Sequence, residues 1–158
     1  MVRLNDIYLV YSNGTRALKG VSLRIDEGEF VFLVGPSGSG KSTVVKLLTA
    51  EIAATQGKVT VNDTGLNKIR PQKVPYFRRT LGVIFQDFRL IENRSVYENV
   101  AFAMRVIGAP RREIKKRVLY VLDLVGLLHK AKRRPRELSG GEQQRVAIAR
   151  ALVNNPRM

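Results

Sequence analysis

Alternation of apolar and polar residues predicts the first strands of this chain. Residues 2–10 form an apolar-rich stretch, and Val21, Leu23 and Ile25 alternate with polar side chains. Residues 59–61 repeat this alternation after a glycine. Because successive side chains of a strand point to opposite faces, these patterns indicate half-buried strands.

Two further stretches are continuously apolar. Residues 30–34 carry no polar side chain, as expected of a central strand that is covered on both faces. Residues 81–85 form a later apolar stretch, interrupted only by a glycine. We expect both stretches to be strands.

Helical spacing appears in three other places. Residues 41–53 carry apolar side chains at helical intervals, and a stripe from Ile114 to Val125 ends at Gly126. A last helix carries Val146, Ala149, Leu152 and Val153, and Pro156 ends it. Strands, a glycine loop and helices in this order predict an α/β or mixed fold.

Composition narrows the class of protein. A length of 158 residues suits one domain, and 44% hydrophobic residues is ordinary for a globular protein. No apolar run approaches the roughly 20 residues that cross a bilayer. The N-terminus has no signal-peptide pattern, and without cysteine there are no disulfides or thiolate metal sites. We therefore expect a cytosolic protein.

The net charge of +15 is unusual, and much of it is local. Residues 105–145 contain 12 basic and 4 acidic residues. A solvated helical face explains such a run, and anionic lipid headgroups are the alternative. Nucleic acid is not expected as a partner, because the positive charges lack interleaved aromatic residues.

The most specific motif is a phosphate-binding loop. Residues 35–42 fit the pattern G-x-x-x-x-G-K-[ST], between an apolar stretch and a helical one. Its glycines allow backbone N–H groups to approach phosphate oxygens, and the helix N-terminus favours an anion. Lys41 supplies a charge to the β- and γ-phosphates, and the Ser42 hydroxyl can ligate Mg²⁺.

A second motif occupies residues 138–145. Ser139 and Glu142 have the spacing of a capping box, which starts a helix. Capping requires neither Gly140 nor Gly141, and two glycines at a helix N-terminus again expose backbone donors to an anion.

With these motifs the sequence resembles the ABC ATPase family, whose signature motif stands here as LSGGE followed by QQR. The resemblance implies an α/β P-loop NTPase nucleotide-binding domain over residues 1–158. A β-rich part with the phosphate loop would cover about 1–85, and a helical signature part about 86–153. It also implies a homodimer that sandwiches two ATP molecules with Mg²⁺. The signature residues that contact the partner's nucleotide would be Ser139, Gly140, Gly141, Glu142 and Gln143.

Two other positions match features of that family. Tyr11 stands where an aromatic ring stacks on adenine, and a strand-end aromatic is the plainer alternative. Gln86 corresponds to the Q-loop glutamine, which contacts Mg²⁺ and water and senses a membrane partner. His129 is expected at the surface. The resemblance thus assigns nucleotide binding to Tyr11, Gly35, Pro36, Ser37, Gly38, Ser39, Gly40, Lys41, Ser42, Thr43 and Gln86, and Mg²⁺ contact to Ser42 and Gln86.

Residues 74–87 and 96–100 resemble the cell-division branch of the family. This resemblance implies an ATP-binding subunit at the cytoplasmic face of the bacterial membrane, coupled to an integral membrane partner. The ATPase of a lipoprotein or macrolide exporter is the alternative, and a soluble ABC protein acting on nucleic acid is a weaker one. Apolar residues of the partner-facing surface would include Phe88, Leu90, Ile91, Val96 and Tyr97, about half of them core.

In the family, the Walker B strand with its two carboxylates follows the position of Arg157. The sequence shows no substitute for these carboxylates. We therefore assign no catalytic residue and expect the 158-residue chain to hydrolyse ATP negligibly.

Overall fold

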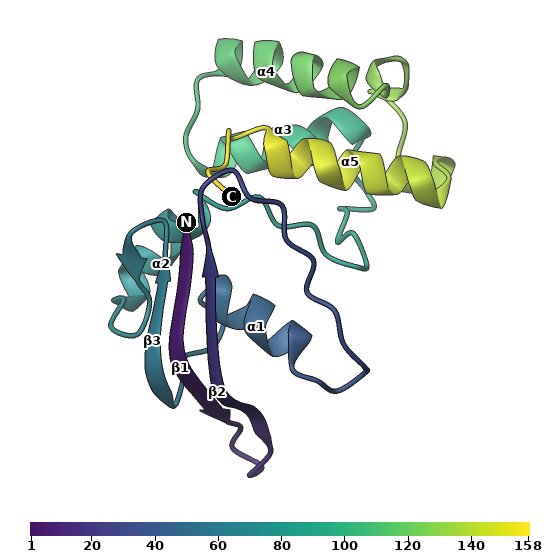
Figure 1. The fold of residues 1–158 in the computed structure, drawn as a ribbon. Coiled ribbons are helices and arrows are strands. Elements are labelled where there is room, and N and C mark those ends of the chain that lie inside the picture. Colours follow the sequence, from purple (N-terminus) through teal and green to yellow (C-terminus); the bar gives the residue numbers. More distant parts are fainter. The chain divides into compact units, whose positions relative to one another are not determined.

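A computed structural model describes all 158 residues, which form two compact units, Met1–Arg78 and Arg79–Met158. The first unit contains a β-sheet and the helix that follows the glycine loop, and the second contains three longer helices (Figure 1). None of the helices has the length and hydropathy needed to span a membrane.

The first unit is built on a four-stranded antiparallel sheet with the strand order β2-β1-β3-β4. Val2 of the central strand lies opposite Ile25 on one side and Val61 on the other. The strands predicted from alternation are confirmed, and their apolar positions supply the buried face. The four strands are β1 (Val2–Val10), β2 (Arg16–Ile25), β3 (Gln56–Val61) and β4 (Thr64–Gly65).

The helix after the glycine loop is α1 (Lys41–Leu48), and it packs near β3. It buries Val44 and Leu47, and Leu47 lines a small cavity together with Val59. The predicted extension to residue 53 is wrong. Ala50 adopts a left-handed φ of 53°, which ends the helical backbone soon after Leu48.

Residues 30–34 do not form the predicted buried strand. They have no regular secondary structure, and their exposed fractions range from 45 to 85%. A strand needs backbone hydrogen bonds with a neighbour, and none joins this segment to the sheet, whose outer strands are β2 and β4. The apolar side chains of residues 30–34 could be buried in a sheet, but in this structure they remain exposed.

Residues 81–85 are not a strand either. The N–H of Gly82 donates to the carbonyl of Met158, and the N–H of Arg157 donates to the carbonyl of Thr80. Two such bonds do not make a continuous ladder, so the predicted strand is wrong in this structure.

The second unit is a bundle of α3 (Val96–Val106), α4 (Arg111–Leu124) and α5 (Gly140–Leu152), gathered around one apolar core (Figure 1). The stripe predicted on α4 is buried, and Gly126 follows it with a φ of 71°. On α5, Val146 and Ala149 are buried while Leu152 is partly exposed. The sequence pattern did not predict α3, although Ser95 and Glu98 form a capping box at its start.

Short elements connect these parts. They are α2 (Val74–Arg78) and the 3₁₀ turns Pro71–Lys73, Leu128–Lys130 and Pro135–Glu137.

Candidate nucleotide-binding site

The glycine loop reaches α1 through a conformation that only glycine adopts easily. Gly40 caps the helix with φ 92° and ψ 3°, in the left-handed region. A Cβ atom at this position would lie 2.8 Å from the carbonyl oxygen of Ala17 and 2.9 Å from a methyl of Leu18. Gly38 also has a positive φ, 80°, but a Cβ there would meet open space. Packing as well as backbone freedom therefore requires glycine at residue 40.

The ammonium group of Lys41 is turned toward the loop. Its Nζ donates to the carbonyl oxygens of Gly35 and Pro36, both at 2.7 Å, and to Ser39 Oγ at 3.3 Å. All three acceptors are neutral, and Lys41 forms no ion pair. Phosphate oxygens would be stronger acceptors for this cation than carbonyls, because they carry negative charge and attract the ammonium group by a direct Coulomb interaction as well.

The first turn of α1 adds backbone donors. Its first intrahelical bond runs from the N–H of Val44 to the carbonyl of Gly40, at 2.9 Å. The N–H groups of residues 41–43 precede this bond and lie outside the helical ladder. No acidic side chain stands in the first turn. A loop of glycines, one lysine and a free helix N-terminus together fit an anion of phosphate type.

Tyr11 lies against this first turn. Its hydroxyl shares a 3.0 Å hydrogen bond with Oγ1 of Thr43, 32 residues away. Thr43 is buried, so the bond fixes the tyrosine ring beside the N-terminus of α1. Ser42, the residue expected to contact Mg²⁺, is exposed at the second position of the helix. The structure thus brings Tyr11, Lys41, Ser42 and Thr43 together in the first unit.

Gln86 belongs to the second unit, where it is exposed in the turn of residues 86–89. Phe88 and Arg89 adopt left-handed φ angles of 55° and 47° in this turn. The guanidinium of Arg150 donates to both of their carbonyls, at 2.5 and 2.6 Å. Burial lowers the pKa of Arg150 from its ordinary value. One half-buried arginine on α5 therefore holds the turn that carries Gln86.

The signature motif starts α5 with a complete capping box. Oγ of Ser139 accepts from the N–H of Glu142 at 3.3 Å, and the Glu142 carboxylate accepts from the N–H of Ser139 at 2.9 Å. Lys130 forms an ion pair with the same carboxylate. The hydrogen bond from Lys130, followed by that from the Ser139 backbone, lowers the pKa of Glu142 to about 2.

The capping interactions decide which signature groups remain accessible. The side-chain amide of Gln143 donates to the carbonyls of Pro135 and Leu138, at 3.1 and 3.3 Å. Gly140 is exposed, and a Cβ on it would meet nothing within 4 Å. Glu142 and Gln143 therefore hold the start of the helix, while the glycines present an open backbone.

The partner-facing residues suggested by the sequence divide between core and surface. Val96 is fully buried, and Leu90 and Tyr97 pack against the helical core. Phe88 and Ile91 are half-buried. His129 is exposed, as predicted.

Comparison with known proteins decides the family. The family model described as ABC transporter matches residues 18–158. The cell division ATP-binding protein FtsE of Streptococcus pneumoniae D39 is 52% identical over 158 residues, covering 100% of this chain and 69% of that protein. The chain belongs to the ABC transporter family.

Other members of the family agree. FtsE of Bacillus subtilis is 53% identical over 156 residues, covering 99% of this chain and 68% of that protein, and FtsE of Escherichia coli K12 is 45% identical over 156 residues, covering 99% and 70%. A dimeric ATP-binding cassette solved in a post-hydrolysis state with ADP and Pi superimposes with a TM-score of 0.88 at 40% identity, covering 99% of this chain and 71% of that one. For cbiO1 of Clostridium perfringens, part of an ABC transporter complex, the TM-score is 0.89 at 32% identity, with 98% and 62% covered. The fold is therefore that of an ABC nucleotide-binding domain. The chain spans about two thirds of the length of its relatives.

Within this ABC cassette, sequence reasoning found the motif residues and missed two residues that support them. Lys130 contacts the signature from 12 residues away, and Arg150 reaches the turn after Gln86 across about 60 residues. Neither has a local sequence pattern, because each acts through a contact that only the folded helical unit creates.

Proposed function

We propose that this chain is the ATP-binding subunit of a bacterial cell-division ABC complex, acting as a pair of copies on an integral membrane partner of the FtsX type. The observation that carries the proposal is the 45–53% identity, over 99–100% of the chain, to proteins called cell division ATP-binding protein FtsE. The same relatives do not favour the alternative of a lipoprotein or macrolide exporter.

In this proposal the phosphate loop holds ATP. Lys41 exchanges its carbonyl acceptors for oxygens of the β- and γ-phosphates, and the N–H groups at the start of α1 bind the same anion. Tyr11, held by Thr43, offers its ring to the adenine. Ser42 would offer its hydroxyl oxygen to Mg²⁺, which would neutralise phosphate charge when bound.

A second copy would complete the site. Two structurally similar ATP-binding cassettes were solved as dimers. The open backbone of Ser139, Gly140 and Gly141 would face the γ-phosphate bound by the other copy. Lys130 and Glu142 fix the direction of these N–H groups. ATP would therefore hold two copies together at the cytoplasmic face of the membrane.

The partner contact can be tested by co-purification with the FtsX-type membrane protein of the same organism. Phe88 is half-buried in the turn that carries Gln86, so Phe88→Glu should abolish co-purification while nucleotide binding persists. Leu90 is less suitable, because it packs against the core and a charge there would destabilise the fold.

Leu124→Glu is the matched control, since Leu124 is an exposed apolar residue at the last position of α4 and lies outside the turn of residues 86–89. It should leave co-purification unchanged. Equal recovery of the membrane protein with wild type and Phe88→Glu would contradict the proposed contact. Recovery of an exporter permease instead would contradict the cell-division role.

A further inference from the structure

The first two turns of α4 carry four basic residues without partners. Arg111, Arg112, Lys115 and Lys116, here called the α4 basic surface, are all exposed. None takes part in the five ion pairs of the structure or in a side-chain hydrogen bond. Glu113 is the one acidic residue between positions 105 and 117. This surface is therefore an uncompensated positive patch.

The four positive charges destabilise the helix that carries them. Arg111 and Lys115 are four residues apart, as are Arg112 and Lys116, and like charges at this spacing repel. They also stand at the N-terminal end, where the helix dipole is already positive. The neighbouring Arg117 differs, because it donates to the carbonyls of Leu152 and Val153 and so supports the bundle. Folding alone gives no reason for the four charges of the α4 basic surface.

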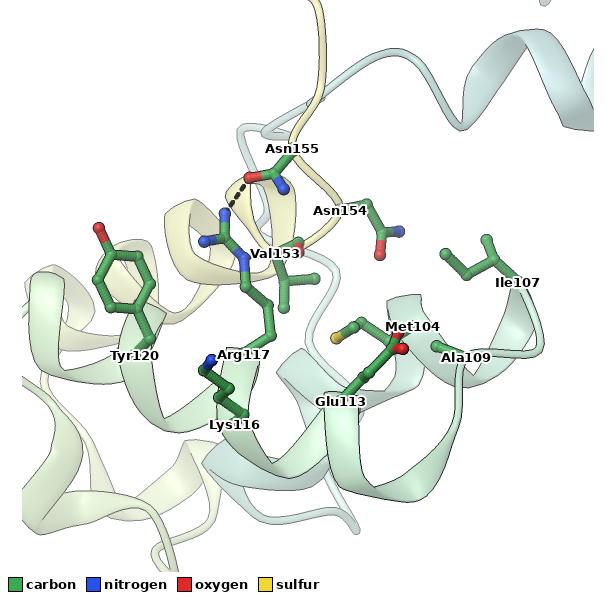
Figure 2. Close-up of a pocket in the computed structure, with 10 residues that line it drawn as sticks. All are labelled: Met104, Ile107, Ala109, Glu113, Lys116, Arg117, Tyr120, Val153, Asn154 and Asn155. Carbon is green, nitrogen blue, oxygen red and sulfur yellow. Dashed lines mark hydrogen bonds between the residues drawn. The ribbon is translucent and has the colours of Figure 1, made fainter.

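Exposed apolar side chains lie next to these charges. Val106 is 59% exposed and Ile107 is 37% exposed, at the end of α3. Ile107 and Lys116 line one open groove of about 490 Å³, and Figure 2 shows Ile107 at the end of α3, with Glu113, Lys116 and Arg117 on α4. Lys116 of the α4 basic surface thus borders the same groove as the exposed Ile107, and Val106 and Ile107 come four to five residues before Arg111 in the chain.

The distribution of charge distinguishes between partners. Arg111, Arg112 and Lys115 do not line the groove, so a peptide seated in it would leave most of the positive charge unmatched. Tyr120 is the one aromatic residue that lines the groove, and the guanidinium of Arg117 lies 5.1 Å from its ring centroid. The surface therefore lacks the series of free aromatic rings on which successive nucleic-acid bases stack. A bilayer presents negative charge over an area and accepts apolar side chains at headgroup depth.

We propose that the α4 basic surface, together with Val106 and Ile107, binds anionic lipid headgroups directly. The contact is separate from the protein partner proposed above and does not depend on it. It gives the helical unit its own attraction to an anionic membrane, through lipid phosphates on the four cations and burial of the two apolar side chains.

The test is sedimentation of the purified chain with phosphatidylcholine vesicles that contain or lack phosphatidylglycerol. The wild-type chain should bind only the anionic vesicles, and added salt should release it. Replacing Arg112, Lys115 and Lys116 together by Gln should weaken binding roughly a hundredfold, at about fivefold for each basic residue near an anionic surface. The variant should fold at least as well as wild type, because it removes repulsion at the helix N-terminus.

A second triple variant removes the same charge elsewhere in the helical unit. Lys132, Arg134 and Arg136 are exposed, and their replacement by Gln should weaken binding far less. An equal loss of vesicle binding in both triple variants would show that only the net charge of the chain matters, and it would overturn the proposal. Absence of binding to anionic vesicles would also overturn it, as would α4-dependent binding to polyglutamate or DNA in place of vesicles.

Discussion

At the scale of single residues, Gly40 begins α1 where Ala17 and Leu18 leave no room for a side chain. Gly40→Ala combines a left-handed φ of 92° with a contact of 2.8 Å to a backbone oxygen. Gly14→Ala is a matched control, since Gly14 has a φ of 82° but open space around its Cβ position. Gly40→Ala should lower the free energy of unfolding by about 1–3 kcal/mol more than Gly14→Ala does.

Chemical denaturation of the two variants measures this difference. Equal losses would mean that only the backbone angle matters and that the loop is not packed against β2 as described. Nucleotide affinity should fall in Gly40→Ala alone, because the displaced loop carries Lys41.

Glu142 gives the fold a dependence on acid pH. Its pKa is lowered from 4.5 to about 2 in the folded chain, so the folded state favours the ionised form. A lowered pKa stabilises above the unfolded value and loses that contribution as the pH falls toward the folded value. The stabilisation from ionised Glu142 should therefore be complete above about pH 4.5 and disappear toward pH 2.

Glu142→Gln isolates this effect, because glutamine also serves in a capping box but does not ionise. The stability difference between wild type and Glu142→Gln, measured by denaturation from pH 6 to 2, should shrink as the pH falls. A difference that stays constant across this range would show that the carboxylate is not held as described. Lys130→Ala should flatten the same pH dependence.

At the scale of elements, Arg150 connects α5 to the turn that carries Gln86. Arg150→Leu leaves the carbonyls of Phe88 and Arg89 without their donor, in a turn whose backbone angles are already strained. It should destabilise the chain by about 1–3 kcal/mol and speed hydrogen exchange around the turn. Arg145→Leu on the exposed side of the same helix is the control and should change neither. Unchanged hydrogen exchange around the turn in Arg150→Leu would contradict the conclusion that Arg150 of α5 holds this turn.

The elements differ in how far the sequence predicts them. The apolar-rich stretch of residues 2–10 and the stripe on α4 predict β1 and α4 correctly, because the apolar side chains of each form a face that packs against its neighbours. Residues 30–34 show the limit of such patterns, since an apolar run becomes a central strand only when distant strands pair with it. Helix α3 shows a second limit, since the sequence assigns Val96 and Tyr97 to a partner-facing surface, whereas in the structure Val96 lies in the helical core and Tyr97 packs against it.

At the scale of the whole molecule, the motifs could be predicted and the interactions that support them could not. Residues 35–42 and 138–145 have fixed spacings, so sequence alone predicts them as sites for phosphate. The bond between Tyr11 and Thr43 joins a strand end to a helix, and only the fold brings these two side chains together. An ABC nucleotide-binding domain is thus recognisable from its motifs, while its preorganisation is visible only in the structure.

The central claim is that residues 35–42 bind ATP, and titration with a fluorescent ATP analogue in the presence of Mg²⁺ tests it most directly. The wild-type chain should bind saturably, and Lys41→Ala should weaken binding by at least about tenfold, since it removes the cation that faces the phosphates. Lys46→Ala, one turn further along α1 and exposed, should bind like wild type. Equal affinity in wild type and Lys41→Ala, or equal loss in both variants, would contradict the assignment of this loop as the ATP site.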